Sequence, residues 1–158
     1  MLFRSDAEGG VTRDGALAAL AAFPERLEAW AAALPEGLLR HRPAPEAFAP
    51  LEQVWHLAEL EAVFGQRLAR LRDEADPHLP DWRGDEAAVA GRYLARDLEA
   101  GLRAFRAARQ ANLAAFAVLT EAQWARRGSQ EGVGPVDLAG LPARMAEHDA
   151  GHAAEMGC

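Results

Sequence analysis

The chain has 158 residues, which is about the length of one domain and enough to bury a core without disulfides. Its 24 acidic residues outnumber its 17 basic residues, all of them arginine, and the net charge of −7 argues against nucleic-acid binding, which usually needs a basic face. The single cysteine, Cys158, excludes an intramolecular disulfide, and because we expect neither a signal peptide nor a membrane-spanning stretch, we expect a cytoplasmic protein.

The N-terminal part of the chain predicts an arm followed by a first helix. Residues 1–13 are rich in glycine and charge and predict a flexible arm, whereas residues 14–158 predict a single domain. Leucines recur at three- and four-residue steps from Leu17 to Leu34, the pattern of an amphipathic helix. Because Pro24 lies inside this repeat, the helix is either kinked there or restarts there.

Two further helices are predicted in the middle of the chain. After a proline-rich connection, Pro50 suits the first turn of a helix that runs to about Leu71. A loop over residues 76–85 contains two prolines and a glycine, which interrupt helices. The third helix is expected from about Glu86 to Leu119.

A fourth helix is predicted at the C-terminus. It follows a glycine-rich loop and runs from near Pro135 or Val136 to about Met156. Strands are not expected, because no window shows sustained alternation of apolar and polar residues. Amphipathic helices without a sheet pack as a bundle, so the sequence predicts an all-α fold, a four-helix bundle.

The last predicted helix carries the strongest functional signal. Its apolar stripe begins at Leu138, Leu141 and Met145, and the next two positions in the same rhythm are His148 and His152. A spacing of four places both imidazoles on one face, one turn apart, where they could bind a single metal ion. The alternative is two unrelated histidines, but two buried rings in succession would each need a partner, so the pair favours a metal site.

His56 is the candidate for a third ligand. It lies roughly 80° from the centre of the apolar stripe of the second helix, near its edge. That position also suits a boundary histidine packed on Trp55. Three nitrogen ligands and a water molecule would form the open coordination sphere typical of a catalytic metal.

Four other polar residues are candidates for a functional role or for an ordinary structural one. Glu61 falls within the apolar sector of the second helix. It could act as a general base, accept a hydrogen bond from a ligating histidine, or form an ion pair with an arginine on another helix. Asp149, beside His148, is either solvated or a similar acceptor. His41 and His78 lie in proline-rich loops, where we expect them to be exposed.

Three stretches of the chain resemble the DinB-like superfamily. RPAPEAFAPLEQVWHLAELE (42–61) is similar to the approach to the second helix and the helix itself in that family. LTEAQWARRG (119–128) resembles the link that leaves its third helix, and LPARMAEHDAGHAAEM (141–156) resembles its closing His-Asp-x-x-His helix. The similarity extends over nearly the whole chain from about Leu17 onward.

The resemblance implies a DinB-like four-helix bundle in which three histidines hold a divalent metal ion, zinc or nickel, with iron or manganese as further options. By motif the ligands are His56, His148 and His152, and Glu61 matches a frequent acidic position that would give it a catalytic role. Relatives include thiol-dependent S-transferases that use bacillithiol, mycothiol or glutathione, a thiol-dependent maleylpyruvate isomerase, and metal-dependent hydrolases. Many of them are homodimers.

The resemblance therefore predicts a metal-dependent S-transferase that joins a low-molecular-weight thiol to a small electrophile. The alternatives are a metal-dependent hydrolase and a metal-binding module without turnover. The expected partners are a small-molecule substrate and a second copy of the chain, with no nucleic acid and no membrane.

Two departures from the family pattern concern stability and assembly. Phe48 and Ala49 stand where the family often has Trp-Ser, and losing a serine N-cap costs about 1 kcal/mol. The last helix ends soon after His152, which argues against dimer packing through a longer C-terminus and leaves the expected ligands in place.

Overall fold

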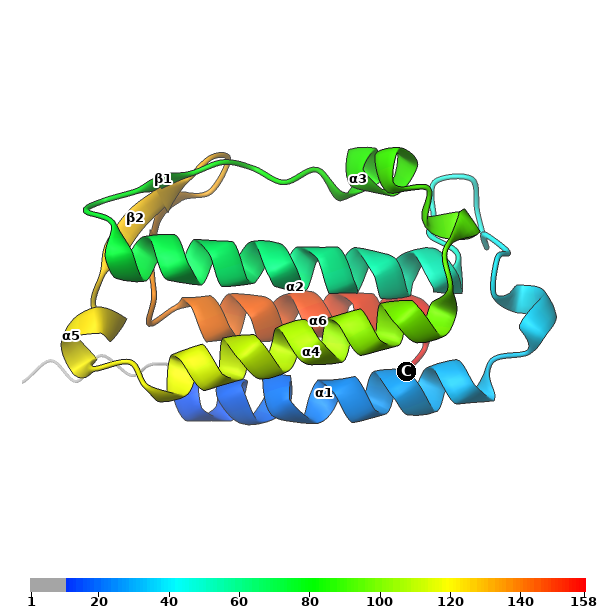
Figure 1. Ribbon diagram of the computed structural model, residues 1–158, viewed down its shortest axis with the longest axis horizontal. Helices are drawn as coiled ribbons and strands as arrows, with labels where there is room; N and C mark the ends of the chain where they lie inside the picture. The colour runs from blue at the N-terminus through cyan, green and yellow to red at the C-terminus, as the bar shows by residue number, and fades with distance from the viewer. Residues whose placement is uncertain (1–10) are drawn as a thin grey trace, which may run out of the picture.

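Four long helices lie side by side and form a bundle (Figure 1). This arrangement confirms the predicted fold class. Helix α2 packs on α4 and α6, and α1 packs on α4 and α6. The four helices are α1 (Arg13–Ala33), α2 (Pro50–Asp73), α4 (Leu98–Ala117) and α6 (Leu141–Met156).

Shorter elements connect the long helices. The computed structural model of the protein describes residues 11–158, so most of the predicted arm over 1–13 lies outside the described residues. No helix of the described part is both long and apolar enough to cross a membrane. The short elements are a 3₁₀ helix (Glu36–Leu38), β1 (His78–Leu79), α3 (Gly84–Gly91), a second 3₁₀ helix (Tyr93–Ala95), α5 (Glu121–Trp124), β2 (Arg127–Gln130) and β3 (Gly134–Asp137).

The first two long helices begin where local capping favours them. The side chain of Thr12 accepts a hydrogen bond from the backbone N–H of Gly15 and caps α1, which continues through Pro24 without restarting. Helix α2 has Pro50 in its first turn, as predicted. Ala49 offers no side-chain cap, but its own backbone N–H donates to Glu52 Oε1 at 3.1 Å. Glu52 therefore makes one of the two hydrogen bonds of a capping box, although alanine stands where the family often has serine.

The prediction of one continuous third helix from Glu86 to Leu119 is wrong. The chain leaves α3 at Arg92, whose φ and ψ of 51° and 51° lie in the left-handed region. Helix α4 then starts afresh after Asp97, whose side chain accepts from the backbone N–H of Ala100. Because Asp is a strong N-cap and a left-handed residue cannot continue a right-handed helix, two helices replace the single one.

The predictions of no strands and of a last helix from Pro135 are also wrong. Strand β2 pairs antiparallel with β3 and parallel with β1, so Pro135 and Val136 lie in a three-stranded sheet. A Cβ atom at Gly128 would lie 2.5 Å from the carbonyl oxygen of Pro77, so this glycine lets β2 approach the β1 segment closely. Strands of two and four residues are too short to reveal a period of two in the sequence.

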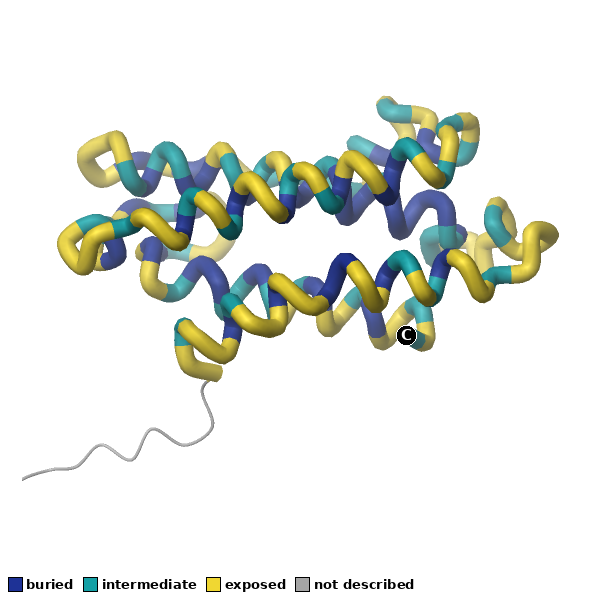
Figure 2. Tube along the Cα trace, turned by 60° about the horizontal axis from the view of Figure 1, so that its bottom comes forward, coloured by how far each residue is buried: buried dark blue, intermediate teal, exposed yellow. Residues whose placement is uncertain are grey.

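Apolar side chains fill the bundle in two clusters. Figure 2 shows buried positions on the helix sides that face one another. The cluster nearer the sheet includes Phe64, Leu68 and Met145. The other includes Phe23 and Phe105, whose rings meet edge to face with centroids 5.9 Å apart. Each fully buried leucine or phenylalanine stabilises the fold by about 1.5–3 kcal/mol relative to exposure, so these two clusters supply much of the stability of the bundle.

Candidate metal centre

The structure brings His56, His148 and His152 together between α2 and α6. Each imidazole offers one ring nitrogen, and these three atoms all lie within 4.8 Å of one another. The Nε2 atoms of His148 and His152 are 3.2 Å apart. The ring of His56 has its centroid 4.5 Å from that of His152 and 5.6 Å from that of His148. These three residues are called the three-histidine cluster below.

The spacing of the His148 and His152 donor atoms fits a shared divalent metal ion. Zinc–nitrogen bonds of about 2.0–2.1 Å in a tetrahedral site place two nitrogens roughly 3.3 Å apart, close to the separation of the His148 and His152 Nε2 atoms. Both ring nitrogens of His56 are buried without a hydrogen-bond partner among the described residues. A buried unpaired polar atom is costly, and coordination of a metal would satisfy one of them.

The environment keeps the three imidazoles neutral near pH 7. Burial, with the neighbouring His152 and His148, lowers the pKa of His56 to about 3. Burial and His152 lower the pKa of His148 to about 4, and burial also lowers the pKa of His152. Neutral imidazoles have a free lone pair, which is the form that binds a metal.

Gln53 orients His152, and the sequence analysis missed it. Nδ1 of His152 lies 2.7 Å from Gln53 Oε1, and the amide nitrogen of Gln53 donates to Glu155 Oε2 at 3.0 Å. Because the amide oxygen only accepts, Nδ1 carries the proton and Nε2 is free to face the cluster. Gln53 precedes His56 by three residues on α2, a spacing that places both on one helix face and could have suggested the role.

Aromatic side chains and a glycine hold the His56 ring. Its centroid lies 5.3 Å from that of Phe48 and 5.4 Å from that of Trp82. A Cβ atom at Gly84 would lie 2.6 Å from His56 Cε1, so only a glycine lets α3 begin directly against the imidazole. Trp55, the alternative neighbour expected for His56, instead donates its indole N–H to the carbonyl oxygen of Asp97.

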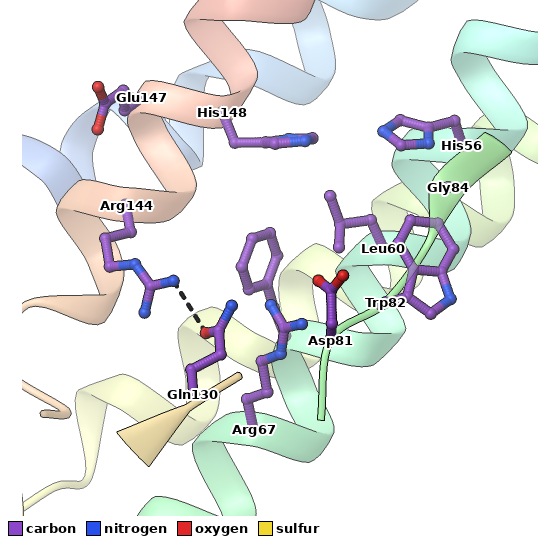
Figure 3. A pocket seen from close by; sticks show the side chains of 11 residues that line it. His56, Leu60, Arg67, Asp81, Trp82, Gly84, Gln130, Arg144, Glu147 and His148 are labelled. Atoms are coloured by element: carbon purple, nitrogen blue, oxygen red, sulfur yellow. Dashed lines mark hydrogen bonds between the residues drawn. The ribbon is translucent and has the colours of Figure 1, made fainter. Parts of the chain in front are cut away.

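A cavity of about 370 Å³ adjoins the three-histidine cluster (Figure 3). His56 and His148 form part of its lining, beside apolar side chains and beside arginines from α2 and α6. The small sheet contributes through Gln130 at the end of β2. The other lining residues are Leu60, Phe64, Arg67, Asp81, Trp82, Gly84, Arg144 and Glu147.

Glu61 and Asp149 bind a buried arginine rather than the histidines. Both carboxylate oxygens of Glu61 accept from Arg109, at 2.8 and 2.9 Å, and both oxygens of Asp149 accept from it at 2.8 and 3.0 Å. Asn112 donates to Glu61 Oε1, and Leu20 provides a carbonyl oxygen for Arg109. Of the alternatives for Glu61, the structure thus has the interhelical ion pair. Asp149 is buried, so the solvated alternative is wrong.

The remaining two histidines of the described chain lie outside the cluster. His41 is exposed in the connection before α2, as expected. His78 is also exposed, in β1, with Nδ1 at 2.9 Å from Ser129 Oγ. Neither belongs to the group of residues that could hold a metal ion.

Two comparisons with known proteins agree with this architecture. The family model described as the DinB superfamily matches residues 19–156. Among solved structures, the chain is similar to YfiT from Bacillus subtilis, described as a probable metal-dependent hydrolase with an unusual four-helix bundle topology. The TM-score is 0.79 at 17% sequence identity, over 92% of this chain and 85% of that chain, so the likeness concerns the fold. The search of curated proteins found no match.

Proposed function

This chain belongs to the DinB superfamily, and on that premise we propose that it is a metal-dependent enzyme acting on a small molecule. His56, His148 and His152 are the proposed ligands of one divalent ion, zinc or nickel, with iron or manganese as further options. The observation that carries the proposal is the convergence of three neutral imidazoles, one of which has no hydrogen-bond partner for either ring nitrogen within the described residues.

We assign the reaction class as transfer of a low-molecular-weight thiol, of the bacillithiol or mycothiol type, to a small electrophile. A divalent cation held by the three imidazoles would lower the pKa of a thiol that reaches it, so that thiolate is present at neutral pH. The thiolate sulfur then forms a bond to the electrophilic carbon, the leaving group departs with its bonding electrons, and the thiol proton passes to solvent.

The protein's own residues would prepare this reaction in three ways. Gln53 holds the proton of His152 on Nδ1 and keeps Nε2 available. The aromatic rings of Phe48 and Trp82 pack against His56 and limit the access of water to it. The adjoining cavity is large enough to receive a small substrate, since ligand sites begin at roughly 300 Å³.

Metal-assisted hydrolysis is the second candidate, favoured by the described activity of YfiT, which shares the fold. Water would replace the thiol as the nucleophile, and the same imidazoles would be required. A closed coordination sphere would favour a metal-binding module without turnover, since structural sites leave no open position. Glu61 is bonded to Arg109, and the metal-binding group found in residues 11–158 contains three histidines alone.

Conjugation of monochlorobimane tests the leading proposal. Protein loaded with zinc or nickel is incubated with bacillithiol, mycothiol or glutathione, and product is followed by fluorescence and mass spectrometry. We expect metal-dependent product with at least one thiol, and its loss in His152→Ala. The matched control is His78→Ala, which changes a histidine outside the cluster. Absence of turnover with every thiol contradicts the transferase, and product formed in thiol-free buffer identifies the hydrolase.

The proposal extends to assembly and location. We propose that residues 14–158 form one domain, that two copies associate as a homodimer, and that the protein acts in the cytoplasm, where thiols are kept reduced. Light scattering across a dilution series measures the assembly, and a monomer at every concentration contradicts the dimer.

A further inference from the structure

Two arginines of the cavity lack the acidic partners that most buried arginines have. Arg67, on α2, is 7% exposed. The one hydrogen bond its guanidinium makes within the described residues goes to the carbonyl oxygen of Pro80 at the long distance of 3.4 Å. No carboxylate oxygen of residues 11–158 lies within 4.0 Å of it, as none of the ion pairs there includes Arg67. An arginine has five N–H donors, so most of those of Arg67 are left for a ligand.

Arg144 approaches the same cavity from α6. Its Nη2 donates to Gln130 Oε1 at 2.9 Å, and within residues 11–158 it makes no ion pair either. Figure 3 shows the guanidinium groups of Arg67 and Arg144 on either side of Gln130, in the cavity that His56 and His148 also line. The small sheet therefore takes part in the site, because it carries Gln130 to this position.

Positive charge is in excess around the two arginines in the buried part of the cavity. Burial and the charge of Arg144 lower the pKa of Arg67, and burial lowers the pKa of Arg144. The charge of Asp81 raises the pKa of Arg67, and the charge of Glu147 raises the pKa of Arg144. Both carboxylates are exposed, however, and neither forms an ion pair with these arginines. An anion bound between the two guanidinium groups would relieve their repulsion and use their free donors.

We propose that Arg67 and Arg144 form a carboxylate-binding subsite beside the three-histidine cluster, so that the substrate or thiol carries a carboxylate. A planar guanidinium matches the two oxygens of a carboxylate. A monoanion suits the subsite better than a doubly charged phosphate, because Asp81 and Glu147 already offset part of the positive charge. The assignment of this ligand as a substrate rests on the proposed function, whereas the anion site itself rests on the arginines.

Titration of the metal-free protein with acetate tests the subsite. The protein carries arginine labelled with an NMR-active nitrogen isotope, and chloride holds the ionic strength constant. We expect saturable shifts of the Arg67 and Arg144 side-chain signals, and affinity for acetate weaker by about 10-fold or more in Arg67→Gln and in Arg144→Gln. Arg103→Gln is the matched control, since Arg103 is exposed on α4 and forms no ion pair within the described chain.

Three outcomes would overturn the subsite. These are no saturable shift in the wild type, equal acetate affinity in Arg144→Gln and the wild type, and tighter binding of inorganic phosphate than of acetate. If Arg67→Gln does not fold, Arg144→Gln decides alone, because its half-buried side chain is less tied to the core. Zinc uptake by the wild type is measured separately. Normal zinc uptake without acetate binding contradicts only the subsite, whereas acetate binding without zinc uptake contradicts only the proposed metal function.

Discussion

Two polar clusters in the bundle interior both include residues of α2 and α6 but differ in how completely their atoms are paired. In the Arg109 cluster, Arg109 makes five hydrogen bonds to Glu61, Asp149 and Leu20, which matches its five N–H donors. In the three-histidine cluster, His56 has two buried nitrogens without a partner in the described structure. Asp149 and His148 are adjacent on α6, yet each belongs to a different cluster.

The difference separates stability from function. A buried charge that is fully paired holds helices in register but offers nothing to a ligand. Buried nitrogens without partners, such as those of His56, destabilise the protein until a ligand binds them, so they are expected at a binding site rather than in a core. We therefore expect changes in the Arg109 cluster to lower stability, and changes around the three-histidine cluster to lower metal affinity at little cost in stability.

The largest effect is expected for Arg109→Met. Without the guanidinium group, Glu61 and Asp149 are buried carboxylates without a cation, and breaking a buried ion pair costs about 3–5 kcal/mol. Urea unfolding of the metal-free protein measures the free energy of unfolding. Arg103→Met on the exposed side of α4 is the control and should change it by less than about 0.5 kcal/mol. Equal stability of the two variants would remove the distinction between the clusters.

A smaller effect is expected for Gln53→Ala. His152 loses the acceptor that fixes its Nδ1 proton, and such a loss lowers metal affinity by about 10- to 100-fold. Competition with a chromogenic chelator measures the zinc affinity. The exposed Gln66→Ala on the same helix is the control and should behave as wild type. Unchanged affinity in Gln53→Ala would show that His152 needs no such support.

The smallest effect is expected for Arg106→Gln. Arg106 Nε lies 2.6 Å from Glu28 Oε1, and this arginine lowers the pKa of Glu28. Both side chains are partly exposed, so water and salt screen the pair, and its loss should lower the free energy of unfolding far less than Arg109→Met does. Urea unfolding at low and high salt provides the measurement. A loss as large as that of Arg109→Met would mean that burial is not what distinguishes the ion pairs of this bundle.

The sequence predicted those features that depend on local spacing. The spacing of the leucines predicts the long helices. The four-residue spacing of His148 and His152 places both on one helix face, independently of the tertiary structure. The break at Arg92 was missed because a left-handed arginine leaves no compositional signal. The sheet was missed because its strands are so short. The sequence does not show which of the 17 arginines pairs with Glu61, because the pairing with Arg109 depends on tertiary contacts. The same is true of the proximity of Arg67 and Arg144 in the cavity.

Metal content after zinc loading and exhaustive dialysis tests the central claim most directly. The account predicts about one equivalent of zinc in the wild type and in a His41→Ala/His78→Ala variant, measured by inductively coupled plasma mass spectrometry. It predicts a small fraction of that content in a His56→Ala/His148→Ala variant that still unfolds cooperatively. A wild type that retains no zinc, nickel, iron or manganese, or a His56→Ala/His148→Ala variant that retains as much as the wild type, would contradict the account.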